Sequence, residues 1–197
     1  MVTGESMQEK YRRRHRTKMD EVRRSHIIRD FIGKDILEIF HEYSLIMAKT
    51  NRPKAGDGQR VTVYEPLIGH CIDLRYGDAL ADSLLLFCRE KISKTVGFDL
   101  VPVTSYYRIY GPECKLPVHV DQPEYEWSAT ICMGYGAHEP WPIFLKREPF
   151  YLEAGDALIY QGAKEEHSRP VFKGSWQSQL FLHYKEVGDE QRQEKNS

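Results

Sequence analysis

Several features that define common classes of protein are missing from this sequence. No stretch approaches the roughly 18 consecutive apolar residues of a transmembrane helix, and the first residues, Met-Val-Thr-Gly-Glu-Ser, lack the basic-then-apolar order of a secretory signal. The formal net charge is −1, so no overall field attracts the chain to nucleic acid or to a membrane surface. We therefore expect a cytoplasmic protein with no membrane partner.

Cysteine pairs at metal-binding or redox spacing are also absent. The four cysteines, at positions 71, 88, 114 and 132, are never closer than 17 residues, so no C-x-x-C pair exists. A zinc knuckle and a thioredoxin-like motif are therefore not predicted. In a reducing compartment these residues are expected to be packed, reduced thiols.

The chain nevertheless has the material for one folded domain. Hydrophobic residues make up 41% and aromatic residues 12% of its 197 positions, enough for a substantial core. We divide it into a basic, flexible N-terminal arm (1–25), a single domain (26–185) and a polar tail (186–197). The arm could bind nucleic acid, but only Tyr11 could serve it as a stacking platform, so a solvated arm is favoured over a nucleic-acid partner.

Hydrophobic periodicity places helices before residue 98 and strands after it. A short strand at 26–32 and an amphipathic helix at 36–46 precede a loop at 51–60, and a second helix begins near Asp78 and ends around Gly97. Further strands are predicted at Leu100–Tyr110, Leu116–Val120, Trp127–Gly134, Pro142–Leu145, Tyr151–Leu152, Asp156–Tyr160, Glu166–Val171 and Ser175–Tyr184. This spacing predicts a mainly β fold with flanking α-helices, an antiparallel sandwich or jelly roll.

One short pattern offers metal ligands. His119-Val120-Asp121 is the only His-x-acid match among the eight histidines, and residues i and i+2 of a strand share one face. An imidazole and a carboxylate can therefore point together into the roll. Two histidines with one carboxylate, leaving open positions, are typical of non-haem Fe(II) oxygenases.

The third ligand must come from farther along the chain. His138 follows after only 19 residues in a turn-rich loop, and His183 lies near the last apolar run. His167 is 48 positions beyond His119, with room for about four short strands between them and one more after it. A late strand of a jelly roll can lie beside an early one, so His167 is favoured as the third ligand. A structural role for this histidine is the alternative.

Three ordered motifs resemble the 2-oxoglutarate/Fe(II)-dependent dioxygenases, in particular the prolyl-hydroxylase-like branch. The segment from Ser105 to Asp121 resembles that family's Tyr-Gly-His-x-Asp entry, Leu152–Tyr160 resembles its Gly-Asp-apolar strand, and His167–Gly174 its distal histidine with Pro-Val. The similarity spans about residues 26–185. It implies a double-stranded β-helix (jelly roll, cupin-like).

The resemblance also implies an activity. His119, Asp121 and His167 would hold Fe(II), with 2-oxoglutarate and O2 as cosubstrates. Asp121 stands where related halogenases have Gly or Ala, so hydroxylation of an unactivated C–H bond is expected. A small-molecule substrate, amino-acid-like or carrier-bound, is favoured. The alternatives are a protein or peptidyl hydroxylase and a non-catalytic jelly-roll module that binds metal or ligand. The oligomeric state stays open, a homodimer among the options.

The sequence departs from the family at the anchor for the remote carboxylate of 2-oxoglutarate. Prolyl-hydroxylase-like members carry a cation about ten residues after the distal histidine, where this chain has Ser175-Trp-Gln-Ser-Gln179. Arg169 would share the inward face of His167 and is the first choice, because guanidinium pairs strongly with carboxylate. Arg108 and Lys173 are alternatives. Supporting hydrogen bonds could come from four polar side chains: Tyr106, Tyr110, Gln177 and Gln179. Use of another 2-oxo acid, or of none, remains open.

Overall fold

Two antiparallel β-sheets form the body of the molecule. The structure, a computed structural model, describes residues 25–50, 64–65 and 67–188. Within these residues the larger sheet has seven strands, in the order β1 (His26–Ile28), β9 (Ala157–Tyr160), β6 (Trp127–Gly136), β11 (Trp176–Glu186), β4 (Leu100–Tyr110), β3 (Gly69–Tyr76) and β2 (Tyr64–Glu65). The smaller has four, in the order β5 (Leu116–His119), β10 (His167–Arg169), β7 (Ile143–Leu145) and β8 (Glu148–Phe150).

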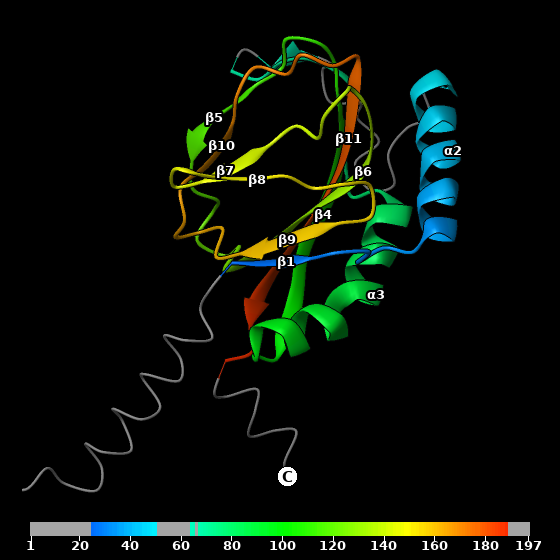
Figure 1. The fold of residues 1–197 in the computed structure, drawn as a ribbon. Coiled ribbons are helices and arrows are strands. Elements are labelled where there is room, and N and C mark those ends of the chain that lie inside the picture. The colour runs from blue at the N-terminus through cyan, green and yellow to red at the C-terminus, as the bar shows by residue number, and fades with distance from the viewer. Residues whose placement is uncertain (1–24, 51–63, 66, 189–197) are drawn as a thin grey trace, which may run out of the picture.

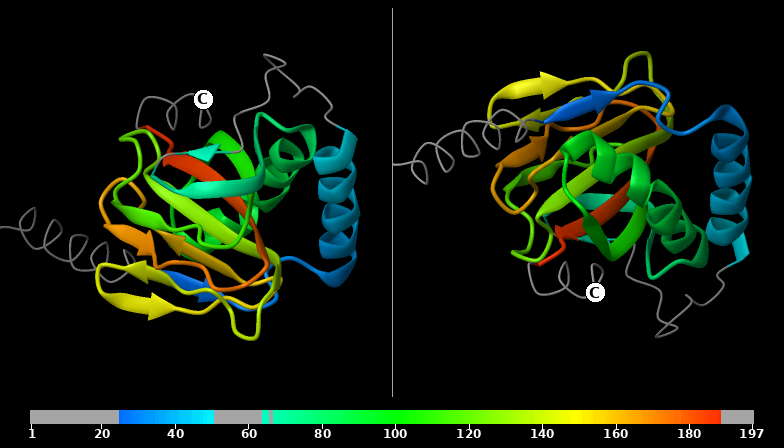
Figure 2. Two further views of the ribbon diagram at one scale, coloured as in Figure 1. Left: turned by 90° about the horizontal axis from the view of Figure 1, so that it is seen from above. Right: turned by 90° about the horizontal axis from the view of Figure 1, so that it is seen from below.

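The two sheets enclose a roll, and the chain passes between them repeatedly. Strands β6, β7, β8 and β9 separate β5 from β10 in the sequence, yet β5 and β10 are hydrogen-bonded neighbours. Figure 2 shows the two sheets from above and below, and Figure 1 shows the smaller sheet on the side away from the helices. The predicted fold class, mainly β with flanking helices in a double-stranded β-helix, is confirmed.

The helices cover the outer face of the larger sheet. α2 (Lys34–Thr50) packs near β6, and α3 (Ala79–Val96) packs on β4 and β11. Helix α3 has the predicted ends: the Asp78 side chain accepts hydrogen bonds from the amides of Leu80 and Ala81, and Gly97 ends the helix at φ 76°. Its apolar stripe, buried against the sheet, comprises Ala81, Leu84, Leu85, Cys88, Ile92 and Val96.

One predicted strand is absent from the structure, and strands β2, β3 and β8 were not predicted. Tyr151–Leu152 is not a strand, because the hairpin partner of β7 is the preceding segment, β8. Strand β3 was missed altogether. Its sequence carries Asp73 and Arg75, which look like surface residues but are both only 1% exposed and form an ion pair at 2.7 Å. A buried charge pair of this kind conceals the hydrophobic pattern of a buried strand.

The predictions for the cysteines, for membrane spans and for the terminal segments can be compared with the described residues. All four cysteines are free and buried, as predicted, and burial raises the pKa of Cys88 to about 12. No helix among the described residues is long and apolar enough to cross a membrane. Almost all of the proposed arm (1–24), the loop at 51–60 and most of the tail (189–197) lie outside the described residues.

Candidate metal centre

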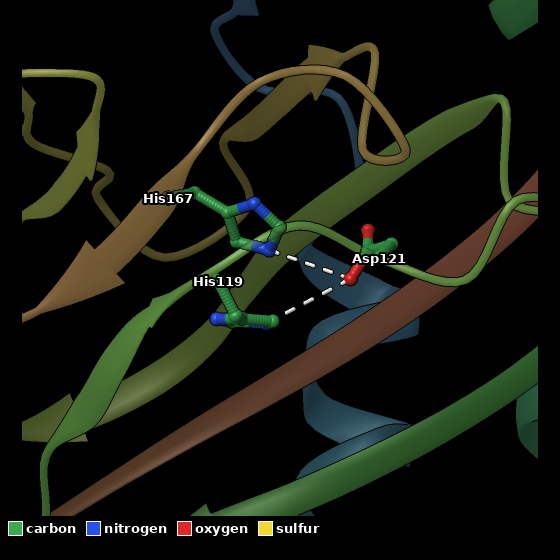
Figure 3. A group of neighbouring side chains, drawn as sticks. All are labelled: His119, Asp121 and His167. Atoms are coloured by element: carbon green, nitrogen blue, oxygen red, sulfur yellow. Dashed lines mark ion pairs between the residues drawn. The ribbon is translucent and has the colours of Figure 1, made fainter.

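His119, Asp121 and His167 converge at one end of the roll. His119 ends β5, His167 begins the neighbouring β10, and the two are paired in register. Asp121 follows β5, and its Oδ1 lies 3.8 Å from His119 Nε2 and 3.4 Å from His167 Nε2 (Figure 3). One ligand atom from each residue falls within 4.8 Å of the other two. This separation is suited to three bonds to one small cation.

Backbone hydrogen bonds fix both imidazoles in the tautomer that metal binding requires. His119 Nδ1 lies 2.9 Å from the Pro117 carbonyl oxygen, and His167 Nδ1 lies 2.9 Å from that of Glu165. A carbonyl can only accept, so each Nδ1 carries the proton and donates it. In the neutral ring, the form that binds a metal, each Nε2 therefore presents a lone pair on the side that faces Asp121. Metal-bound histidines are usually oriented by this kind of contact.

The charge states of the three groups also suit a cation. Burial raises the pKa of Asp121, but the hydrogen bond and charge of His167 in its doubly protonated form, the charge of His183 and the Ser128 hydroxyl outweigh it and lower the pKa to about 2. Asp121 is therefore an ionised carboxylate at neutral pH. Burial and the neighbouring His167 lower the pKa of His119, which favours its neutral form. Neutral imidazole and ionised carboxylate are the ligating forms.

The site is open on one side. The His119 side chain is 38% exposed, whereas that of His167 is 3% exposed. Val118 and Val120 point outward, because residues alternate between the two faces of an extended segment. A ligand therefore reaches the three donor atoms past His119, while His167 forms the inner wall with the ring of Tyr160 at 4.9 Å.

Arg169 ends strand β10 and is buried, as is His167 two residues before it. Its side chain is buried, Nη1 donates to the Trp141 carbonyl oxygen at 2.7 Å, and the guanidinium lies 5.0 Å above the Trp141 ring. Nη2 donates at 2.8 Å to the Gln179 amide oxygen, in the amide orientation that satisfies both groups. Among the described residues no carboxylate pairs with this cation, and its Nε–H finds no acceptor.

The remaining predicted groups divide into buried and exposed ones. Tyr110, Gln177 and Arg108 are buried, and Arg108 lies 5.3 Å from the Tyr110 ring. Gln177 is paired with Tyr110 across β11 and β4. Lys173 and His138 are exposed beside a separate cavity of about 400 Å³ that also contacts Trp141. The structure therefore brings Arg169, Gln177 and Tyr110 into the interior and leaves Lys173 outside.

Solved structures with a similar architecture include the following three. HygX from Streptomyces hygroscopicus, solved with nickel, 2-oxoglutarate and hygromycin B, is 10% identical, with a TM-score of 0.63 over 88% of this chain and 87% of that chain. A prolyl-4-hydroxylase from Pseudomonas putida is 14% identical, with a TM-score of 0.60 over 86% and 97%. The viral collagen prolyl hydroxylase of Paramecium Bursaria Chlorella virus-1 is 7% identical, with a TM-score of 0.60 over 83% and 96%.

The chain has the double-stranded β-helix fold of the 2-oxoglutarate/Fe(II) oxygenases. At these identities the likeness establishes the fold, which agrees with the sequence resemblance. No protein-family model and no curated protein matches the sequence.

Three residues around Asp121 were not predicted as part of the site. Ser128 Oγ donates to Asp121 Oδ2 at 2.6 Å, and His183 Nδ1 lies 2.9 Å from the same Oγ. Gly162 accepts a hydrogen bond from the Asp121 amide at 2.9 Å through its carbonyl oxygen. Only the pairing of strands β6, β9 and β11 brings these residues beside the loop after β5. His183, which the sequence set aside as a ligand, lies behind the carboxylate.

Gly162 has no side chain, and the Asp121 carboxylate occupies the space that a side chain would need. A Cβ atom at this position would overlap both Asp121 Oδ2 and Ser128 Oγ. We expect Gly162→Ala to displace the carboxylate and weaken Mn(II) binding to the metal-free protein by about 10- to 100-fold, as changes behind a metal ligand typically do. Calorimetric titration measures this. In the control Gly33→Ala, the added Cβ meets nothing within 4 Å, so unchanged affinity is expected. Wild-type affinity in Gly162→Ala would contradict the assignment.

Proposed function

We propose that this chain is an Fe(II)- and 2-oxoglutarate-dependent oxygenase that hydroxylates an unactivated C–H bond of a small molecule. The observation that carries the proposal is the group of two oriented imidazoles and one ionised carboxylate, with a buried guanidinium two residues after His167 on β10. Two histidines and a carboxylate on one side of a metal are the donor set of non-haem Fe(II) oxygenases. A fully protein-enclosed tetrahedral site would require a fourth ligand, which the described residues do not offer.

Arg169 supports 2-oxoglutarate as the cosubstrate. A buried cation without an opposite charge is costly, and Arg169 keeps an unused Nε–H. A dicarboxylate that reached inward from the metal would meet this guanidinium and gain charge-assisted hydrogen bonds. Gln179 and Trp141 would hold the guanidinium in place through the bonds that they already make.

The residues of the site would divide the work between binding and orientation. Bound iron and 2-oxoglutarate would supply the oxidising chemistry, in which O2 yields succinate, carbon dioxide and one oxygen atom for the substrate. His119, Asp121 and His167 would occupy one face of the ion and leave the other for cosubstrate and O2. Tyr110, whose pKa is raised by burial, keeps its proton and can donate a hydrogen bond. Gln177 lies next to it on β11.

Anaerobic reconstitution tests the proposal directly. Metal-free protein mixed with Fe(II) and then 2-oxoglutarate should develop a weak visible charge-transfer band, which either component alone should not produce. Admission of O2 should convert 2-oxoglutarate to succinate, even without a substrate at a slow rate. A folded protein that binds Fe(II) yet shows neither the band nor succinate would refute the choice of cosubstrate.

The substrate class can be tested in the same assay. The small-molecule preference is supported by HygX, whose solved structure holds hygromycin B. A peptidyl hydroxylase is the second candidate, because the similar structures include two prolyl hydroxylases. Candidate small molecules and proline-containing peptides should differ in how far they accelerate succinate formation. Succinate formation would also exclude the non-catalytic jelly-roll module.

A further inference from the structure

The second oxygen of Asp121 is held by a row of side chains that contains no metal ligand. Ser128 on β6 pairs in register with His183 on β11 and with Tyr160 on β9, so the three side chains share one level of the larger sheet. Ser128 Oγ lies 2.6 Å from Asp121 Oδ2 and 2.9 Å from His183 Nδ1. The row lies behind the carboxylate, on the side away from Oδ1.

Proton counting sets the direction of both hydrogen bonds. Ionised Asp121 is only an acceptor, and a hydroxyl has one proton. The proton in the 2.6 Å contact therefore belongs to Ser128. The Ser128 oxygen is then the acceptor toward His183, so His183 must donate its Nδ1–H. The order His183 to Ser128 to Asp121 is the arrangement that satisfies all three groups.

The His183 ring is also fixed in orientation. It is 2% exposed and lies between two tyrosine rings, stacked on Tyr125 at 4.3 Å and on Tyr106 at 5.7 Å between ring centroids. Its Nε2 is buried and has no hydrogen-bond partner among the described residues. The imidazole therefore makes its one hydrogen bond to Ser128, and the stacked rings oppose a rotation that would break it.

We propose that Ser128 and His183 are positioning residues for the metal-binding carboxylate. The hydrogen bond from Ser128 holds Asp121 Oδ2, so that Oδ1 faces the two Nε2 atoms before an ion binds. Because His183 donates to the Ser128 oxygen, the Ser128 hydroxyl proton points toward Asp121. The proposal rests on the proposed function, since it assumes that Asp121 is a metal ligand. Neither residue contacts the reacting atoms. Their effect is to preorganise a ligand that would otherwise sample several rotamers.

Metal affinity in the absence of turnover provides the test. Titration of Mn(II) into the metal-free full chain should give a Kd about 10- to 100-fold higher for Ser128→Ala than for wild type. His183→Leu, which removes the Nδ1–H donor, should raise the Kd in the same direction. His183→Asn should restore most of the affinity, because its amide N–H can take the place of Nδ1–H. Rescue by Asn is not expected if the ring only fills space.

Ser105 supplies a matched control. Its buried Oγ donates to the Asp82 carboxylate at 2.6 Å, the same contact chemistry, but toward helix α3 on the other face of the sheet. Ser105→Ala should lower the melting temperature about as much as Ser128→Ala and leave the Mn(II) Kd unchanged. Equal Kd values for Ser128→Ala and wild type would overturn the proposal, as would equal loss in His183→Leu and His183→Asn. A wild type that binds no Mn(II) would instead refute the proposed function.

Discussion

Replacing His167 with alanine is expected to abolish metal binding and turnover together. His167 is the inner wall of the site, and its Nε2 lies 3.4 Å from the Asp121 oxygen that faces the ion. Removal of a residue behind a ligand costs about 10- to 100-fold in affinity, so loss of a ligand itself should exceed 100-fold. The Mn(II) Kd and the yield of succinate measure the two effects.

The control for this variant is His138→Ala. His138 is exposed in the loop between β6 and β7 and is not part of the metal group. It should keep wild-type affinity and activity. If His167→Ala folds and still binds Mn(II) as tightly as wild type, the three-residue site is disproved.

The second large effect is expected at Arg169. Arg169→Gln should raise the Kd for 2-oxoglutarate by at least about 100-fold, because loss of one partner from a buried ion pair costs about 3 to 5 kcal/mol. Binding of Mn(II) alone should stay unchanged, which separates the anchor from the metal ligands. Titration of 2-oxoglutarate into the Mn(II)-loaded protein provides the measurement.

The stability of the unliganded protein should not fall with the affinity for 2-oxoglutarate. Without a bound dicarboxylate, the Arg169 guanidinium is a buried charge with no acidic partner among the described residues. Arg169→Gln should therefore not lower the melting temperature of the unliganded protein. The control is Lys173→Gln, which removes an exposed cation and should change neither the melting temperature nor the Kd for 2-oxoglutarate. Unaltered 2-oxoglutarate affinity in Arg169→Gln would assign the anchor elsewhere.

Local signals predicted the parts of the fold that depend on neighbouring residues. Helix α3 was bounded correctly because Asp78 and Gly97 act through their own backbone contacts. Strand β4 was bounded correctly because β-branched and aromatic residues dominate its sequence. The pair at positions 119 and 121 was proposed from the His-x-Asp pattern and from the resemblance to the 2-oxoglutarate/Fe(II) dioxygenases. The predicted link to His167 depended on the count of intervening strands, which the structure shows to be four.

The features that the sequence did not predict all depend on contacts between distant segments. The two charged residues Asp73 and Arg75 made β3 look like an exposed segment, but they form an ion pair with each other in the interior. Ser128 and His183 are 55 positions apart and meet only because β6 and β11 are neighbours. Gly162 is needed because Asp121 Oδ2 and Ser128 Oγ occupy the space that a Cβ atom would fill. No single segment contains this information.

The two proposed histidine ligands come from the smaller sheet, whereas the serine that holds the carboxylate belongs to the larger one. An ion bound there would act as a cross-link between the two halves of the sandwich. Occupancy and folding would then be thermodynamically coupled: a free ion concentration of 100 times the Kd adds about 2.7 kcal/mol to the free energy of unfolding. Metal supply would thus govern how long the folded protein persists as well as how fast it works.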